Sequence, residues 1–186
     1  MRKTFINTLV EEAKKDARIF LITPDIGYSV LEPFMEQFPE RFLNVGVAEQ
    51  NAVSIAAGLA LSGMIPYVYT IAPFVTMRPF EQIRVDVAYM NTNVRIVGVG
   101  AGFSYGAAGA THHSIEDIAI MRAIPNMTVV CPGDPWEVRE AVKQSLSYKG
   151  PIFLRLGKQG EPVINILIRF LKSEKQLQFI MGKIFI

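Results

Sequence analysis

The chain has 186 residues, enough for one domain with a buried core, and half of its residues are hydrophobic. Its formal net charge of +2, and the lack of any Lys/Arg-rich block or membrane-length apolar run, argue against nucleic acid and membranes as partners. The single cysteine, Cys131, excludes an internal disulfide and a cysteine metal cluster, which fits a reducing, cytoplasmic location.

Helix-like and strand-like segments alternate along the chain. Residues 4–16 carry their apolar side chains on one stripe and predict an amphipathic helix, and the apolar run 18–22 predicts a buried strand. Further on, we expect helices over 29–38, 48–61, 79–89, 114–123 and 135–148. Strands are expected over 42–45, 65–69, 94–99, 127–131 and 151–156.

This alternation predicts an α/β fold of three layers, a mostly parallel sheet with helices on both faces. In such folds the loops beyond the carboxyl ends of the strands carry the functional residues. We therefore expect the site in the loops 23–29, 46–50, 70–79 and 100–114. Cys131 is interpreted as a core residue at the end of a buried strand.

The sequence pattern changes near residue 163. Residues 1–163 fit one domain, whereas 164–186 are rich in Ile, Leu, Phe and Lys and follow no regular period. We interpret 164–186 as an atypical C-terminal tail, for which an amphipathic helix followed by a strand is one option.

Glu49 lies where a predicted strand runs into a predicted helix. A carboxylate in the first turn of a helix complements the helix dipole, so a purely structural role explains its position. The same position, at the carboxyl end of a strand, is also typical of a functional acid in an α/β fold. Position alone favours the structural interpretation.

Two further segments could be taken for a metal site and for a dinucleotide-binding loop, but the sequence favours neither. His112 and His113 are the only histidines, and adjacent side chains rarely converge on one metal, so we predict no metal site. The glycine-rich segment 98–103 does not follow the GxGxxG pattern of dinucleotide-binding loops. We interpret it as a loop lining a substrate channel.

Four segments resemble, in the same order and spacing, the pyrimidine-binding domain of transketolases. The resemblance is strongest to the C-terminal section of split, two-subunit transketolases and covers about residues 3–163. The matching segments are 46–51 with 56–60, Phe74 with 78–84, 111–117, and 122–135. The family implied by this resemblance depends on thiamine diphosphate.

The resemblance implies that Glu49 hydrogen-bonds the aminopyrimidine ring of the cofactor and favours the imino tautomer that deprotonates thiazolium C2. Phe74 would stack on the same ring, with an ordinary core phenylalanine as the alternative. Gln50, Ile71 and Met77 are further candidate cofactor-binding residues.

On the substrate side, the resemblance makes His112 the candidate acid–base or orienting group, and His113 a neighbour without a catalytic role. Lys158 matches a position that contacts substrate phosphate, although a solvated surface lysine fits the sequence equally. In place of a histidine and an aspartate of the family this chain has Gly100 and Ala108, so the resemblance does not specify the ketose donor.

The diphosphate-binding domain of the family, which carries the Mg²⁺ ligands, has no counterpart in this sequence. The resemblance therefore implies a diphosphate-binding partner subunit that holds Mg²⁺, and a homodimer or heterotetramer. Residues 164–186 stand where the family continues into a third domain.

We expect a transferase subunit that moves a two-carbon ketol unit between sugar phosphates and is active only with its partner. Two alternatives remain: a component similar to the β subunit of a 2-oxoacid dehydrogenase, and a truncated remnant that associates with a partner without turnover.

Overall fold

The computed structural model describes residues 1–158 and 160–164, so the expected tail, apart from Ile164, lies outside the described residues. Within these residues one six-stranded sheet has the order β2-β1-β3-β4-β6-β5, and all its neighbouring strands are parallel. The strands are β1 (Ile19–Thr23), β2 (Phe42–Asn44), β3 (Ile65–Ile71), β4 (Arg95–Val99), β5 (Thr128–Val130) and β6 (Ile152–Leu156).

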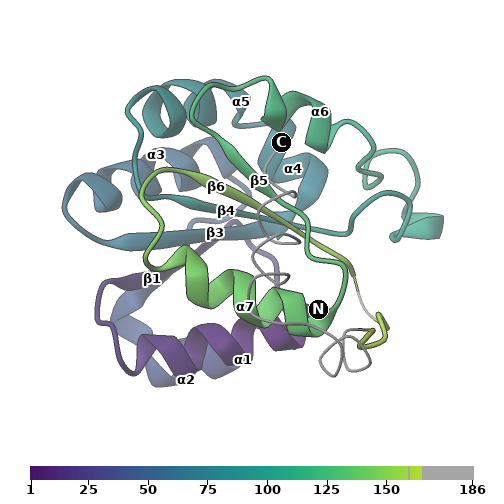
Figure 1. Ribbon diagram of the computed structural model, residues 1–186. Coiled ribbons are helices and arrows are strands. Elements are labelled where there is room, and N and C mark those ends of the chain that lie inside the picture. The colour runs from purple at the N-terminus through teal and green to yellow at the C-terminus, as the bar shows by residue number, and fades with distance from the viewer. Residues whose placement is uncertain (159, 165–186) are drawn as a thin grey trace, which may run out of the picture.

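Helices cover both faces of the sheet, which confirms the three-layer α/β architecture (Figure 1). One face carries α1 (Arg2–Ala13), α2 (Glu32–Gln37) and α7 (Pro135–Ser145). The other face carries α3 (Glu49–Leu61), α4 (Ala72–Met77), α5 (Phe80–Gln82), the π-helix η2 (Ile83–Tyr89) and α6 (Asp117–Arg122). Two short 3₁₀ helices, η1 (Pro39–Arg41) and η3 (Gly106–Ala108), lie in connections.

The strands contribute side chains to two hydrophobic cores, because successive side chains point to opposite faces of a sheet. In β3, Tyr67 and Tyr69 belong to the core under α1 and α7, whereas Val68 belongs to the core under α3. Phe5 of α1 stacks on Tyr69 with ring centroids 5.6 Å apart. Because the strands are buried on both faces, their sequences are nearly continuous runs of apolar residues.

The segment 70–89 differs from its prediction. The expected loop 70–79 contains α4, and the expected helix 79–89 is a short α5 that continues as the π-helix η2. Pro73 is tolerated because it lies in the first turn of α4, where its missing N–H has no helical partner. Pro79 then separates α4 from α5, since it cannot donate to the preceding turn.

Gly98 allows α4 to pack closely on the sheet. A Cβ atom at this position in β4 would lie 2.8 Å from Cε2 of Phe153 and 3.1 Å from Cβ of Ala72. The first residue of α4 therefore approaches the strand at a distance that a larger residue would prevent. This approach sets the position of Phe74, two residues further along α4.

Cys131, expected in the core, is half-buried beside the core under α3, and burial raises the pKa of its thiol. None of the described helices combines the length and the apolar character needed to cross a membrane.

Candidate active site

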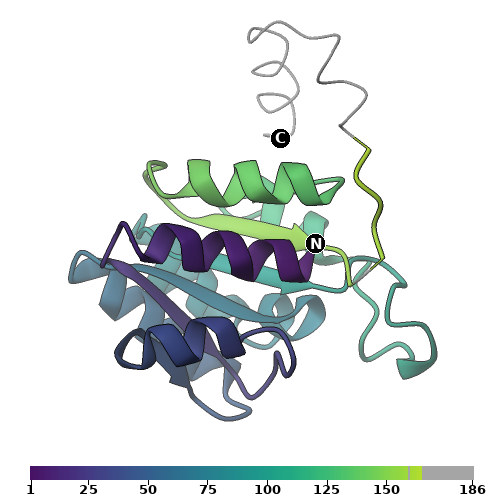
Figure 2. The ribbon, with the colours of Figure 1, turned by 90° about the horizontal axis from the view of Figure 1, so that it is seen from below.

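The connections that follow β2, β3, β4 and β6 meet at one edge of the sheet, because all strands run parallel. The segment after β4 projects from the body of the molecule at the same end as the N-terminus (Figure 2). All four loops that the sequence analysis selected lie at this edge: 46–50, 70–79 and 100–114 follow β2, β3 and β4, and 23–29 follows β1, which is parallel to them. The residues expected to act on the cofactor and substrate come from this edge.

A tight turn places Glu49 at the start of α3. Gly46 has a left-handed φ of 70°, which glycine adopts without strain. The side chain of Asn44 holds this turn, since its Oδ1 accepts hydrogen bonds from the backbone N–H of Gly46 at 2.9 Å and of Asp25 at 3.0 Å. Glu49 follows as the first residue of α3 and is only 2% exposed. The positive end of the helix dipole therefore lies beside a buried carboxyl group.

Arg78 connects Glu49 to Phe74. Its Nη1 donates to Oε1 of Glu49 at 2.7 Å, and its guanidinium carbon lies 4.0 Å from the centroid of the Phe74 ring. The ion pair joins a buried carboxylate to a guanidinium whose side chain is 42% exposed. One cation thus touches both residues that were expected to hold the pyrimidine ring.

His112 packs against the other residues of the edge. Its ring lies 5.1 Å from the Phe74 ring in an edge-to-face arrangement and 5.6 Å from the Tyr105 ring. The Nδ1 atom of His112 shares a 2.9 Å hydrogen bond with Oγ1 of Thr111. His113 is directed elsewhere: its Nε2 lies 3.1 Å from the carbonyl oxygen of Gly106, and its ring packs on Phe103.

Lys158 extends this series of contacts. Its Nζ lies 4.6 Å from the centroid of the Tyr105 ring, and its carbonyl oxygen accepts a hydrogen bond from Nε of Arg2. Burial raises the pKa of the Tyr105 hydroxyl. Glu49, Phe74, His112 and Lys158 are therefore linked through Arg78 and Tyr105 into one continuous group.

The remaining candidates have different surroundings. Gln50 is exposed at the start of α3, and Met77 is 41% exposed at the end of α4. Ile71 is buried at the end of β3, where the alternation of the strand puts it on the same face as Tyr67 and Tyr69, opposite α3. Roles for these three residues in cofactor binding stay predictions.

Among residues 1–158 and 160–164, no three His, Cys, Asp or Glu side chains gather in a way that could hold a metal ion.

The whole described domain matches a known family. The model of the transketolase pyrimidine-binding domain matches residues 1–162. The chain belongs to the transketolase pyrimidine-binding domain family. This confirms the resemblance inferred from the four sequence segments.

Relatives of this transketolase domain include single subunits of split enzymes. The chain is 41% identical over 183 residues to an apulose-4-phosphate transketolase subunit of Phocaeicola vulgatus, an alignment that covers 98% of this chain and 56% of the relative. It is 40% identical over 184 residues to a putative transketolase C-terminal section of Methanocaldococcus jannaschii, again covering 98% of this chain and 56% of the relative. The chain thus spans about half the length of the curated relatives that it matches.

A solved structure shares the fold as well. It is described as a split gene transketolase, inactive beta4 tetramer, and superposes with a TM-score of 0.78 at 38% identity. The superposition covers 88% of this chain and 53% of the other.

The sequence analysis missed two features of this candidate site. Arg78 lies within a matching segment but was given no role; its spacing of four residues from Phe74 places both side chains on one face of a helical segment. Tyr105 was missed because nothing in its local sequence distinguishes a ring that contacts His112 and Lys158 from a solvated loop residue.

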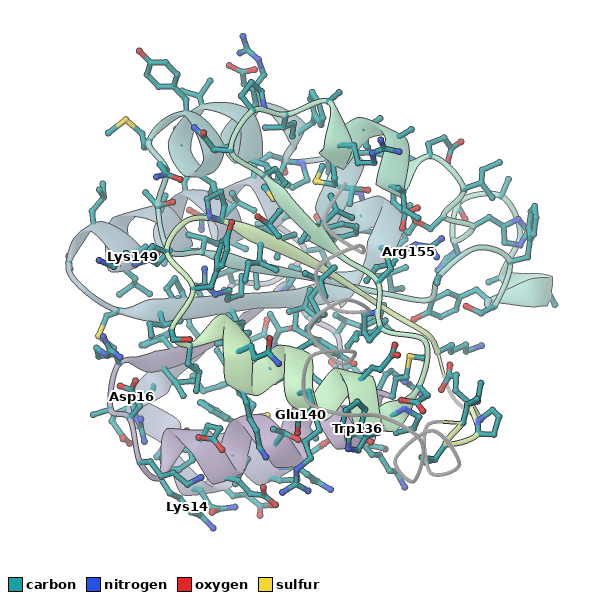
Figure 3. All side chains as sticks on the ribbon, in the orientation of Figure 1. Lys14, Asp16, Trp136, Glu140, Lys149 and Arg155 are labelled. Carbon is teal, nitrogen blue, oxygen red and sulfur yellow. The ribbon has the colours of Figure 1, made fainter. Side chains whose placement is uncertain are left out.

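A buried ion pair anchors the loop that carries His112. Nε of Arg155 donates to Oδ2 of Asp117 at 2.7 Å, and Nη2 of Arg155 donates to the carbonyl oxygen of Ser114 at 3.0 Å. Arg155 lies near the carboxyl end of β6, with Lys149 at the opposite end of the strand (Figure 3). Gly102 and Ser114 close the base of the loop through hydrogen bonds of 3.0 and 2.9 Å between their backbones.

Replacing Asp117 with Asn should loosen this loop. The substitution leaves the guanidinium of Arg155 without its charged partner, so we expect a loss of about 1–3 kcal/mol in the free energy of unfolding. Amide hydrogen exchange at Gly102 and Ser114 should accelerate more than exchange in β3. Denaturant unfolding and residue-resolved exchange measure the two effects.

Glu11→Gln is the matched control, because its ion pair with Arg139 is about half exposed on both sides. We expect that control to change stability by less than about 1 kcal/mol. Unchanged exchange at Gly102 and Ser114 in the Asp117 variant would show that the ion pair does not hold the loop.

Proposed function

We propose that this chain is the pyrimidine-side subunit of a thiamine-diphosphate-dependent, transketolase-like enzyme. The observation that carries the proposal is the buried carboxyl of Glu49 grouped with the Phe74 ring at the carboxyl edge of a sheet that matches the transketolase pyrimidine-binding domain. The names of the relatives, which describe one as a transketolase subunit and another as a C-terminal section, support a polypeptide that needs a partner.

The residues present fit an aminopyrimidine ring. Glu49 supplies a carboxyl group that is shielded from water, where a hydrogen bond is electrostatically stronger than in water. Phe74 is partly exposed and supplies a flat aromatic face, which contributes about 0.5–1.5 kcal/mol beyond the area it buries. A hydrogen-bonding carboxyl and a stacking surface are what a flat heteroaromatic ring requires.

The role of Glu49 follows from the chemistry of the cofactor. Thiamine diphosphate supplies a weak carbon acid at thiazolium C2, an exocyclic amine that can act as its base, and an electron sink. Glu49 would hold the bound cofactor by sharing a proton with the ring nitrogen opposite that amine, which would favour the imino tautomer. The carboxyl would thus act as a general acid–base group on the cofactor rather than on the sugar.

His112 and Lys158 are proposed to act on the substrate. Thr111 is hydrogen-bonded to Nδ1 of His112. We therefore assign the substrate role to Nε2, which would orient a sugar hydroxyl or exchange a proton with it. The ammonium group of Lys158 would bind the phosphate of a sugar phosphate. The proposed reaction is the transfer of a two-carbon ketol unit between such sugars.

The partner is proposed to be a diphosphate-binding subunit that contributes the Mg²⁺ ligands. This chain is proposed to be cytoplasmic and to form a homodimer by itself or a heterotetramer with that partner. A related split-gene transketolase is described as inactive in its beta4 tetramer, which supports the need for a second kind of subunit. The active site would then lie at an interface between two polypeptides.

Calorimetric titration with thiamine diphosphate and Mg²⁺ tests this function. We expect binding when the chain is mixed with a candidate diphosphate-binding subunit, together with ketol transfer that neither polypeptide performs alone. Glu49→Gln should lower the rate of transfer about 10²–10⁴-fold. If the mixture neither binds the cofactor nor transfers ketol units, the catalytic assignment has to be abandoned in favour of a non-catalytic association.

A further inference from the structure

The Arg78 guanidinium makes both contacts that the proposed function assigns to the aminopyrimidine ring. It donates to Oε1 of Glu49 at 2.7 Å, and it lies on the face of Phe74 at 4.0 Å from the ring centroid. We propose that Arg78 is a built-in competitor for the pyrimidine position, a role that rests on the proposed function. Its side chain has to leave Glu49 and Phe74 before a ring can bind there.

The competition has a chemical basis. A guanidinium is planar, carries N–H donors in its plane and stacks on aromatic rings, as does a pyrimidine ring protonated opposite its amine. Both groups offer an N–H to a carboxylate while presenting a flat face to Phe74. Arg78 therefore satisfies the carboxyl and the aromatic face in the way that the ring would.

The Arg78 guanidinium and the pyrimidine ring exclude each other because both need the same small exposed surfaces of Glu49 and Phe74. Glu49 is 2% exposed, so its carboxyl can be approached only over a narrow range. Phe74 is partly covered by His112, whose ring packs against it at 5.1 Å in an edge-to-face arrangement. The guanidinium of Arg78 lies over the Phe74 ring as well, so a second flat group has to share the exposed part of that ring with it.

Arg78 can move away without disturbing the core. It caps the C-terminal end of α4, is followed by Pro79, and keeps 42% of its side chain exposed. Rotating the side chain into water breaks one ion pair and one cation–π contact and opens no cavity in either core. The ring can bind only to molecules in which Arg78 is displaced. The apparent affinity for the ring is therefore the intrinsic affinity multiplied by the fraction of such molecules.

The first test measures cofactor affinity in the assembled enzyme. Calorimetry with thiamine diphosphate and Mg²⁺ compares the unchanged chain with Arg78→Met, which keeps side-chain length and removes the charged donors. We expect the dissociation constant to fall roughly three- to thirty-fold, because the displaced fraction rises to unity. The control is Arg84→Met, which makes the same change in net charge at an exposed residue paired with Glu81 at 3.5 Å.

The second test needs no turnover. The Arg78 side-chain N–H resonances should carry a ring-current shift from Phe74 in the chain without added cofactor, and Phe74→Leu should remove that shift. Titrating the assembled enzyme with thiamine diphosphate should move the same resonances to the values of a solvated arginine. Arg78→Lys identifies the resonances by their loss.

The outcomes separate this inference from the proposed function. Cofactor binding that depends on Glu49, combined with equal or weaker binding by Arg78→Met, overturns the competitor role and leaves the function standing. Arg78 resonances that keep their ring-current shift at saturating cofactor also overturn it. If the assembled enzyme binds no cofactor, the function and the competitor role fail together.

Discussion

Replacing Glu49 with Gln should lower kcat of the assembled enzyme about 10²–10⁴-fold, the range expected for loss of a general acid–base group. The amide of glutamine can accept a hydrogen bond but does not share a titratable proton with the ring nitrogen, so the imino tautomer loses its support. Steady-state ketol transfer by the mixture of both subunits measures the effect. The comparison uses thiamine diphosphate at a saturating concentration, so that a loss of affinity does not mimic a loss of turnover.

The matched control is Glu81→Gln, which removes a carboxylate from an exposed pair with Arg84 and leaves the edge of the sheet unchanged. That variant should keep the activity of the unchanged chain. A Glu49→Gln enzyme that retains more than about a tenth of the original kcat would contradict the acid–base role and return Glu49 to a structural one.

Replacing Arg95 with Met should destabilise the fold by about 3–5 kcal/mol, because three backbone carbonyl oxygens lose their donor and each such loss costs about 1–3 kcal/mol. Arg95 lies in β4 with 1% exposure, and its guanidinium donates to the carbonyl oxygens of Ser145 at 2.6 Å, Tyr148 at 2.8 Å and Gly150 at 2.6 Å. These carbonyls end α7 or follow it, where helical partners are absent. Methionine leaves them without a donor beside an existing cavity of about 330 Å³.

Denaturant unfolding at constant m-value measures this loss. Arg139→Met is the control, because Arg139 also belongs to α7 but its ion pair with Glu11 is about half exposed on both sides. The control should change the free energy of unfolding by less than about 1 kcal/mol. A loss below about 1 kcal/mol for Arg95→Met would mean that water in the cavity replaces the lost donors.

Much of the architecture was predictable because it is encoded locally. Strand and helix periodicity are properties of neighbouring residues, and the buried strands of a parallel sheet are apolar on both faces. The strand–helix junction at Glu49 was visible for the same reason, since a short turn with a glycine separates two clear patterns. The helix α4 was missed because six residues beginning Ala72-Pro73 contain a residue that usually breaks helices.

The candidate site was predictable only in part. Phe74, His112 and Lys158 were singled out by resemblance, and the structure brings them together with Glu49. The residues that connect them, Arg78 and Tyr105, carry no local signal of that role. Roles for Gln50, Ile71 and Met77 stay predictions, with Ile71 buried on the opposite face of the sheet.

The sequence by itself therefore determined the alternation of strands and helices, the parallel α/β class and the position of Glu49 at a strand–helix junction. Only the tertiary structure decided that Asp117 meets Arg155 across 38 residues, and that one guanidinium lies on both Glu49 and Phe74. Periodicity acts between neighbours along the chain, whereas these contacts depend on which strands are adjacent in the sheet. That order arises when the whole core is buried at once, so no single segment specifies it.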